Sequence, residues 1–194
     1  MVGIPEGSDS ALVQAVLKGD TAAYRGLVEK YQGRVYTVIY GMVRNREDAR
    51  DLAQESFVRA FQNLKSFRLE SSFYTWLYRI AMNTAIDHLR RQKQRAAEAY
   101  DEGIATKEVG GVMSTGAHND SPGRSLERKR LHEKLLAALE TLPEDQRQAI
   151  VLREIDGLSY REIAEILDIP EGTVMSRLFY ARKKLQGALG TEAA

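Results

Sequence analysis

Cysteine is absent from this chain of 194 residues, which excludes disulfides and thiolate metal sites and gives no reason to expect an oxidising compartment. Long apolar runs are also missing, because no stretch approaches the roughly 18 apolar residues that a membrane-spanning helix needs. The first residues, MVGIPEGSDS, lack the basic flank and apolar run of a signal peptide. We therefore expect a soluble, cytoplasmic protein with no membrane insertion.

Signs of catalysis or cofactor binding are equally scarce. The histidines, His88, His118 and His132, are scattered without the spacing of metal ligands. The sequence contains no phosphate-binding glycine loop and no nucleophile elbow. It thus predicts no metal site, no cofactor and no catalytic residue, and it indicates a protein that is not an enzyme.

The chain does contain a series of helical apolar patterns, and no strand-like alternation interrupts them. Its composition, 43% hydrophobic and 28% charged residues, fits one ordinary domain or two small ones. Residues 96–124 carry glycines and turn-forming residues that interrupt every possible helix, so they predict a flexible linker. We therefore predict an all-α fold of two small helical domains, residues 1–95 and 125–194, joined by that linker.

The stretch from Leu158 to Leu185 predicts a helix-turn-helix. Ser159 and Glu162 have the spacing of a capping box, which satisfies two backbone donors at the start of the first helix. A short break ends at Pro170, which can open a second helix but cannot continue the first. The apolar stripe of the second helix, expected to pack on the first, consists of Val174, Leu178, Ala181 and Leu185.

The opposite face of this second helix mixes hydroxyl groups, aromatic rings and cations. It carries Ser176, Phe179, Tyr180 and Lys183, flanked by Arg177, Arg182 and Lys184. These groups suit the base edges and phosphates of a DNA major groove. A solvated basic helix in an ordinary bundle is the alternative, but the capped helix, short break and basic helix together favour DNA. For Arg177, an ion pair with Glu162 is an alternative to a DNA contact.

Charge is segregated along the chain although the formal net charge is only +1. Basic residues cluster at 90–95, 128–130 and 182–184, whereas acidic residues gather at 47–55. This segregation indicates two kinds of partner surface. Since phosphate neutralisation supplies much of the affinity for DNA, we expect the free chain to bind DNA weakly and to share recognition with a partner.

Asn45 is the predicted N-cap of a further helix. The apolar side of that helix, expected to be buried, consists of Ala49, Leu52, Ala53, Phe57, Ala60, Phe61 and Leu64. Its other side carries Asp48, Asp51, Gln54, Glu55 and Arg59. The carboxylates are spaced for one solvated helix face and no histidine is nearby in sequence, so we do not interpret them as a metal or acid–base site.

Four aromatic residues, Phe73, Tyr74, Trp76 and Tyr78, open a helical run that ends in the basic segment 88–93. Single-stranded DNA recognition requires such a combination, with flat surfaces for unstacked bases and cations for the backbone. Aromatic stripes more often serve packing, and the residues on one shared apolar face are Phe73, Leu77, Ile80, Ala81 and Leu89. Trp76 fits either role.

Parts of both predicted domains resemble a known family. Leu142-Pro143-Glu144, residues 149–154, Gly157-Leu158-Ser159-Tyr160 and Gly172-Thr173-Val174 resemble region 4 of the bacterial extracytoplasmic-function (ECF) sigma factors of the sigma-70 family. Upstream, residues 47–57 resemble region 2.2 and residues 72–87 resemble regions 2.3 and 2.4 of the same class. The resemblance implies a sigma factor that binds core RNA polymerase, recognises minus-35 and minus-10 promoter elements and initiates transcription. It also implies a stress- or envelope-response regulon and an anti-sigma factor as a partner.

The resemblance assigns roles to three sets of residues. Core polymerase binding falls to Asp51, Gln54 and Glu55. Recognition of the single-stranded minus-10 element, with its flipped base, falls to Phe67, Trp76, Arg79, Asn83, Asp87, Arg90 and Arg91. Duplex minus-35 contacts fall to Thr173, Met175, Ser176, Arg177, Phe179, Tyr180, Arg182 and Lys183.

Asn83, Met175 and Tyr180 have features that bear on these roles. The Asn83 amide can donate and accept hydrogen bonds at once, although from the residues alone a helix-surface or interhelical amide is the more common role. Met175 and Tyr180 stand where members of the family often place a basic residue, so we expect an altered preference for the upstream element.

Two other classes of protein stay open on sequence grounds. A dimeric regulator that binds duplex DNA without polymerase would use the helix-turn-helix, but it leaves the run 73–91 and the acidic helix without purpose. An interaction module or nucleic-acid enzyme is the second alternative, and the absence of a clustered catalytic constellation argues against an enzyme.

Overall fold

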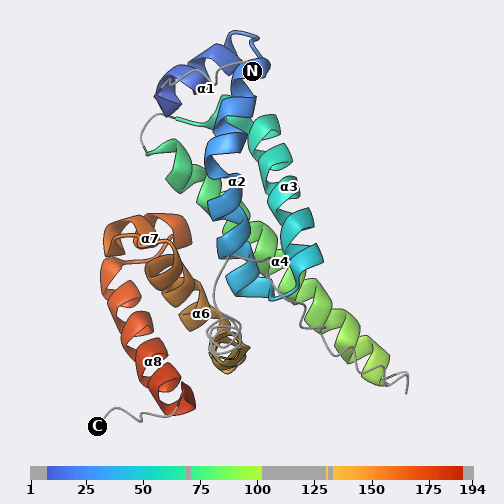
Figure 1. Ribbon diagram of the computed structural model, residues 1–194, viewed down its shortest axis with the longest axis vertical. Coiled ribbons are helices and arrows are strands. Elements are labelled where there is room, and N and C mark those ends of the chain that lie inside the picture. The colour runs from blue at the N-terminus through green and yellow to red at the C-terminus, as the bar shows by residue number, and fades with distance from the viewer. Residues whose placement is uncertain (1–7, 69–70, 102–129, 131–132, 190–194) are drawn as a thin grey trace, which may run out of the picture.

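The protein is all-α, as predicted: in the computed structural model, which describes residues 8–68, 71–101, 130 and 133–189, every regular element is a helix (Figure 1). The first domain comprises α1 (Asp9–Leu17), α2 (Ala22–Val43), α3 (Arg46–Asn63), the short 3₁₀ turn η1 (Leu64–Ser66) and α4 (Phe73–Asp101). The second comprises a helical segment at residues 133–140, α6 (Glu144–Ile150), the π-helical segment η2 (Val151–Ile155), α7 (Tyr160–Leu167) and α8 (Glu171–Leu189).

Side-chain hydrogen bonds form at the start of two helices of the first domain. Asp20 Oδ1 accepts a hydrogen bond from the Ala22 N–H at 3.1 Å, at the start of α2. Asn45 is the N-cap of α3, as predicted, and its Oδ1 accepts from the N–H groups of Glu47 and Asp48 at 2.9 and 3.2 Å. These bonds satisfy donors that have no partner inside the helix.

Helices α2, α3 and α4 pack side by side as the core of the first domain, and α1 covers one end of α2 (Figure 1). The buried side of α3 consists of the predicted residues Ala49, Leu52, Ala53, Phe57, Ala60 and Leu64. The predicted burial of Phe61 is wrong, because this side chain is 42% exposed. Its ring lies at the edge of the contact between α2 and α3, where it meets the Tyr24 ring edge-on with centroids 4.9 Å apart.

Helix α4 continues to Asp101, past residue 95, where the sequence analysis ends the first domain. The predicted linker therefore begins within a helix. The rest of that linker, residues 102–124, and the predicted start of the second domain at 125 lie outside the described residues. Within the described part of the chain, no helix combines the length and apolar character that crossing a membrane requires.

The helix-turn-helix of the second domain has the predicted form. In the capping box of α7, Ser159 Oγ accepts from the Glu162 N–H at 3.3 Å, and Glu162 Oε2 accepts from the Ser159 N–H at 2.7 Å. Asp168 ends α7 in the left-handed conformation, with φ 54°, and α8 follows directly after Pro170. The predicted stripe packs inward: Val174, Leu178 and Ala181 are buried and Leu185 is partly buried.

The two domains lie against each other. The η2 segment packs on α2, and α7 packs on α4 (Figure 1). The buried side chains of both domains form one continuous cluster. The start of α4, which carries Tyr74, therefore lies against α7 of the second domain.

Candidate nucleic-acid and protein interfaces

The outer face of α8 exposes three large apolar side chains. Met175 is 52% exposed, Phe179 62% and Tyr180 57%, and the two rings meet edge-to-face with centroids 5.4 Å apart. The sequence forces this arrangement, because the buried stripe of α8 occupies the opposite side of the helix. Exposed rings beside hydroxyls can contact thymine methyl groups and base edges in a major groove.

Two of the predicted cations on α8 are already paired with acidic side chains of the same domain. Arg182 donates from Nε and Nη2 to Glu154 Oε1 at 3.1 and 2.7 Å, and this bond raises the pKa of the guanidinium above its ordinary value. Arg177 Nε lies 3.4 Å from Asp145 Oδ2. Lys183 is exposed next to Arg182.

Arg177 has a structural partner, but the partner proposed from the sequence, Glu162, is wrong. The Glu162 carboxylate already accepts hydrogen bonds from Ser159 and from Tyr74 of the first domain. Arg177 is paired with Asp145 of α6 instead. This pair ties the first half of α8 to α6.

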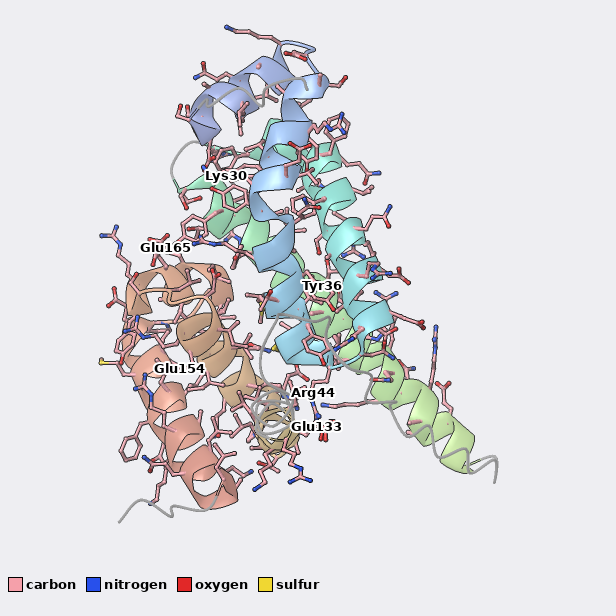
Figure 2. All side chains as sticks on the ribbon, viewed as in Figure 1. Lys30, Tyr36, Arg44, Glu133, Glu154 and Glu165 are labelled. Atoms are coloured by element: carbon pink, nitrogen blue, oxygen red, sulfur yellow. The ribbon has the colours of Figure 1, made fainter. Side chains whose placement is uncertain are left out.

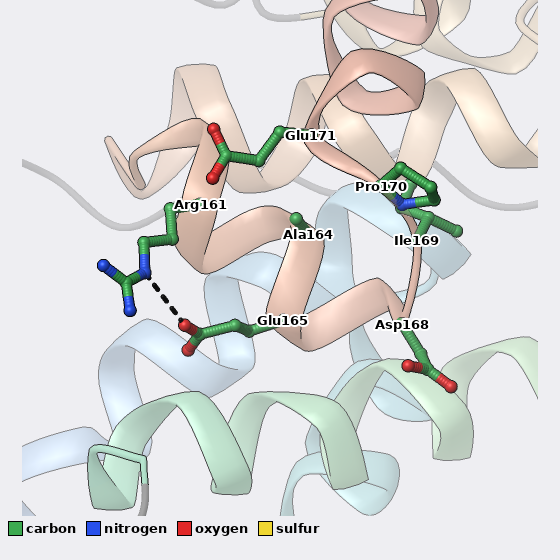
Figure 3. Close-up of a pocket in the computed structure, with 7 residues that line it drawn as sticks. All are labelled: Arg161, Ala164, Glu165, Asp168, Ile169, Pro170 and Glu171. Atoms are coloured by element: carbon green, nitrogen blue, oxygen red, sulfur yellow. Dashed lines mark hydrogen bonds and ion pairs between the residues drawn. The ribbon is translucent and has the colours of Figure 1, made fainter.

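The smaller polar residues lie at the start of α8. Ser176 Oγ donates to the Thr173 carbonyl at 2.9 Å while the side chain stays exposed. A shallow cavity of about 500 Å³ lies between α7 and the start of α8, and its charged lining is mostly acidic: Arg161, Glu165, Asp168 and Glu171 (Figure 3). Arg161 is itself paired with Glu165 at 3.3 Å. The acidic lining makes this cavity unsuited to a phosphate.

The aromatic residues at the start of α4 form a cluster with the residue that ends η1. Trp76 lies 5.2 Å from Phe67 and 5.9 Å from Phe73, measured between ring centroids. Phe67 and Phe73 are buried, whereas Trp76 is only partly buried. Phe67 therefore packs against the Trp76 ring and does not project toward solvent, whereas Trp76 remains partly accessible.

A polar stripe continues from Trp76 along one face of α4. Its members are spaced three or four residues apart, which places them on one side of a helix; they are Arg79, Asn83, Asp87 and Arg90, with Arg91 beside them. Asn83 and the three arginines are exposed, and Asp87 is partly exposed. From Trp76 to Arg90 the stripe is about 21 Å long at 1.5 Å per residue. The structure thus brings the predicted minus-10 residues of α4 together in one line.

A cavity of about 370 Å³ opens at the Trp76 end of this stripe. The first domain contributes Ser66, Arg68, Ser71, Thr75, Trp76 and Arg79, and α7 contributes Glu165 and Asp168. An aromatic ring that lines a cavity together with guanidinium groups can stack on an unpaired base while the cations contact phosphates. Arg68 was not singled out from the sequence, because the loop after η1 carries no pattern that distinguishes it from a solvated arginine.

The outer face of α3 is acidic at its centre. Asp51 and Gln54 are exposed, and Glu55 is paired with Arg59 at 2.6 Å. Val58, 49% exposed, lies two helical turns after Asp51 on the same face and was missed from the sequence. An apolar residue among carboxylates favours a protein partner over nucleic acid, since its burial adds to the binding free energy without a phosphate contact.

Three or more potential metal ligands do not gather anywhere in the described residues. The candidate surfaces are an apolar and basic helix face on α8, an aromatic and polar stripe on α4 and an acidic helix face on α3. Each suits a macromolecular partner.

Comparison with known proteins identifies the family. The family Sigma-70 region 2 matches residues 27–95, and the family Sigma-70, region 4 matches residues 132–185. The ECF RNA polymerase sigma-E factor of Haemophilus influenzae is 41% identical over 191 residues, which cover 94% of this chain and 95% of that protein. The sigma-E factor of Escherichia coli K12 is 42% identical over 187 residues, which cover 92% of each chain. The chain therefore belongs to the sigma-70 family, among the ECF RNA polymerase sigma factors.

Solved structures share the fold. CnrH, in complex with the cytosolic domain of CnrY, has a TM-score of 0.68 at 23% identity and covers 96% of this chain and 100% of its own. The sigma factor RpoE of Bartonella quintana, in complex with the anti-sigma factor NepR, has a TM-score of 0.67 at 24% identity, with 87% and 98% covered. The resemblance noted from the sequence is thus confirmed at the level of family and fold.

Proposed function

We propose that this chain binds core RNA polymerase through the acidic face of α3 and directs it to promoters through α8 and the stripe on α4. In this account α8 reads the duplex minus-35 element, and α4 holds the single-stranded minus-10 element as the promoter opens. The observation that carries the proposal is that one chain of the sigma-70 family exposes both an apolar and basic helix face on α8 and an aromatic and polar stripe on α4. The chain contributes recognition and strand capture, and the polymerase performs the chemistry.

The α4 stripe supplies the groups that strand capture needs. The partly buried Trp76 ring offers a stacking surface, and Arg68 and Arg79, which line the same cavity, offer cations for the phosphates. Asn83, exposed one turn further on, presents an amide that both donates and accepts, so it can read the edge of an unpaired base. Base–aromatic stacking is worth about 1–3 kcal/mol per base, which helps to offset the cost of unpairing.

The α8 face supplies duplex contacts of an unusual kind. Its centre is occupied by Met175, Phe179 and Tyr180, and two of its cations are held by Glu154 and Asp145. Minus-35 recognition by this chain then depends on apolar and hydroxyl contacts with bases more than on guanidinium contacts. Few free cations also mean that α8 alone binds DNA weakly, and the polymerase-bound state supplies the rest of the affinity.

The proposal includes a cytoplasmic location and control by an anti-sigma factor. One of the solved structures of similar fold is a complex with an anti-sigma factor. A partner of that kind, acting on this chain, would connect transcription to an external signal, and a stress- or envelope-response regulon fits such control.

The test is a pull-down of purified core RNA polymerase by the tagged chain, followed by transcription from a pool of promoter fragments. We expect retention of core polymerase and new sequence-selective transcripts. A chain that binds specific duplex DNA as a dimer and ignores core polymerase would instead be a conventional regulator, and that result would overturn the proposal.

A further inference from the structure

Three large apolar side chains form a continuous patch on the outer face of α8, called here the α8 patch. Its members, Met175, Phe179 and Tyr180, are each more than half exposed, and the two rings meet edge-to-face. From Met175 to Tyr180 the patch extends about 7.5 Å along the helix at 1.5 Å per residue. This length matches about two base-pair steps of roughly 3.4 Å in duplex DNA.

The opposite side of α8 provides the packing of this helix. Val174, Leu178 and Ala181 are buried, so α8 is held in its domain without the α8 patch. Large apolar side chains left in water forfeit the free energy of burial, and contiguous exposed patches mark interaction sites. The α8 patch is therefore a surface for a partner.

The arginines on either side of the α8 patch are engaged by carboxylates. Arg182 donates to Oε1 of Glu154, which lies in the second domain beside α8, at 2.7 Å (Figure 2). Arg177 Nε lies 3.4 Å from Asp145 Oδ2. Reading guanine through O6 and N7 requires a free guanidinium fork, and either arginine would have to leave its carboxylate to provide one. Lys183 is exposed and, as a point charge, suits a phosphate.

The bases differ in what they present to an apolar surface in the major groove. Guanine, cytosine and adenine are distinguished there by hydrogen-bond donors and acceptors, whereas thymine adds a C5-methyl group. An apolar side chain placed against a donor or acceptor leaves that group unpaired, which costs binding free energy. Against a methyl group the same side chain gains burial. The α8 patch therefore favours A·T pairs through the thymine methyl group.

We infer that the α8 patch reads the C5-methyl groups of pyrimidines, with Met175, Phe179 and Tyr180 as the residues that determine the preferred duplex sequence. The identity of that duplex as a minus-35 element rests on the proposed function. Thymine is the base selected in unmodified DNA. Because 5-methylcytosine carries the same group on the same carbon, methylation of a cytosine that faces the α8 patch strengthens binding.

The first part of the test removes single methyl groups from the DNA. The chain in complex with core polymerase selects duplexes from a pool with a randomised upstream element, and each thymine of a selected duplex is then replaced by deoxyuridine. This replacement removes the methyl group and keeps the hydrogen-bonding edge of the base. Binding of fluorescein-labelled duplexes, measured by anisotropy, should weaken about fourfold at each contacted thymine, the value of one buried methyl group.

The second part of the test assigns each methyl group to a side chain. Met175→Ala, Phe179→Ala and Tyr180→Ala should each abolish the effect of deoxyuridine at the position that the missing side chain contacts, since a double-mutant cycle isolates that pair. Lys183→Ala is the control, and it should weaken binding of thymine and deoxyuridine duplexes alike. A side chain that only supported the fold would not give this position-specific coupling.

Two further changes test the choice of base. Tyr180→Arg adds a guanidinium fork to the α8 patch and should move the selected base at one position from thymine to guanine. Gln186→Arg adds the same charge at an exposed residue about 9 Å further along α8 and should leave the selected bases unchanged. At a position where deoxyuridine weakens binding, a duplex with 5-methylcytosine should bind more tightly than the same duplex with cytosine.

The outcomes separate methyl reading from the proposed function. Deoxyuridine tolerated at every position overturns methyl reading even if the chain directs transcription, and so does equal binding of 5-methylcytosine and cytosine. An effect of deoxyuridine that persists in all three alanine variants also overturns it and assigns the preference to DNA shape. If core polymerase is not retained, the proposed function fails, and the same selection by the full chain alone decides methyl reading. A chain that selects no duplex overturns both.

Discussion

Tyr74 in α4 donates a hydrogen bond to Glu162 in α7, 88 residues further along the chain. Glu162 uses its other carboxylate oxygen in the capping box that starts α7. One side chain thus fixes both the beginning of the first helix of the helix-turn-helix and the position of that helix on the first domain. Burial, followed by the bond to Glu162, raises the pKa of Tyr74 above its ordinary value, so this hydroxyl stays protonated and able to donate at physiological pH.

The first prediction concerns the pH dependence of this arrangement. Hydrogen bonds from Ser159 and Tyr74 lower the pKa of Glu162 from its ordinary 4.5. The unfolded chain therefore binds a proton at Glu162 more readily than the folded chain does. The contribution of Glu162 to the stability of the fold is complete above pH 4.5, and it is lost as the pH falls through the lowered pKa of the folded state. Glu162→Gln keeps an acceptor for the capping box but removes the negative charge at the start of α7, so it should reduce the free energy of unfolding by about 0.3–1 kcal/mol near neutral pH. The difference should shrink as the pH falls below 4.5.

Urea unfolding at a series of pH values measures this difference. Glu98→Gln, which removes an exposed carboxylate of α4 outside the capping box, is the control and should change the unfolding free energy little. A constant difference between wild type and Glu162→Gln down to acidic pH would contradict the account of this carboxylate.

The second prediction concerns Asn83. Asn83→Ala should reduce promoter opening, measured by permanganate reactivity of unpaired thymines, while retention of core polymerase stays at the wild-type level. Because Asn83 is exposed, the substitution should not change the fold. Gln92→Ala, an exposed change on another face of α4, is the control. Equal loss of opening and of core binding would point to misfolding and against a base-reading role.

The third prediction concerns α8. Tyr180→Ala should shift the preferred minus-35 sequence and weaken binding to the best site by about 1–3 kcal/mol for each lost base contact. Ser176→Ala should shift the preference at a neighbouring base. Transcription from a randomised upstream element gives the profile directly, with Gln186→Ala near the end of the helix as the control. Profiles identical to wild type would remove these residues from the recognition surface.

The fourth prediction concerns the acidic face of α3. Asp51→Arg or Glu55→Arg should lower the affinity for core polymerase, because each places a cation where the partner surface is expected to be basic. Val58→Ala should lower it too, through lost apolar burial of about 25 cal/mol per Å². Glu29→Arg on α2 makes the same charge change away from this face. Full retention of polymerase by all three α3 variants in a pull-down would refute the assignment.

Local patterns made the helix-turn-helix and the α3 cap predictable. A capping box and an Asn cap are decided within four residues of chain, and both are present as the sequence indicates. The apolar stripes of α3 and α8 were also readable, since burial follows the helical period. Phe61 does not follow the pattern: its ring contacts Tyr24 of α2, but the side chain stays 42% exposed.

Contacts between distant segments could not be predicted. Arg177 pairs with Asp145 of α6, whereas the Glu162 carboxylate of α7 accepts from Ser159 and from Tyr74 of the first domain. Gly41 gave no sequence signal beyond a glycine in a helical pattern, yet it is the point where η2 approaches α2. The same limit hid Arg68, whose proximity to Trp76 depends on the loop between η1 and α4.

The most direct test of the account is run-off transcription with purified core RNA polymerase on a pool of bacterial promoter fragments, with and without this chain. The account predicts new transcripts from a subset of fragments that share two spaced elements, lost with Asn83→Ala and redistributed with Tyr180→Ala. Stable binding of core polymerase with transcripts that show no shared upstream and downstream elements would contradict it.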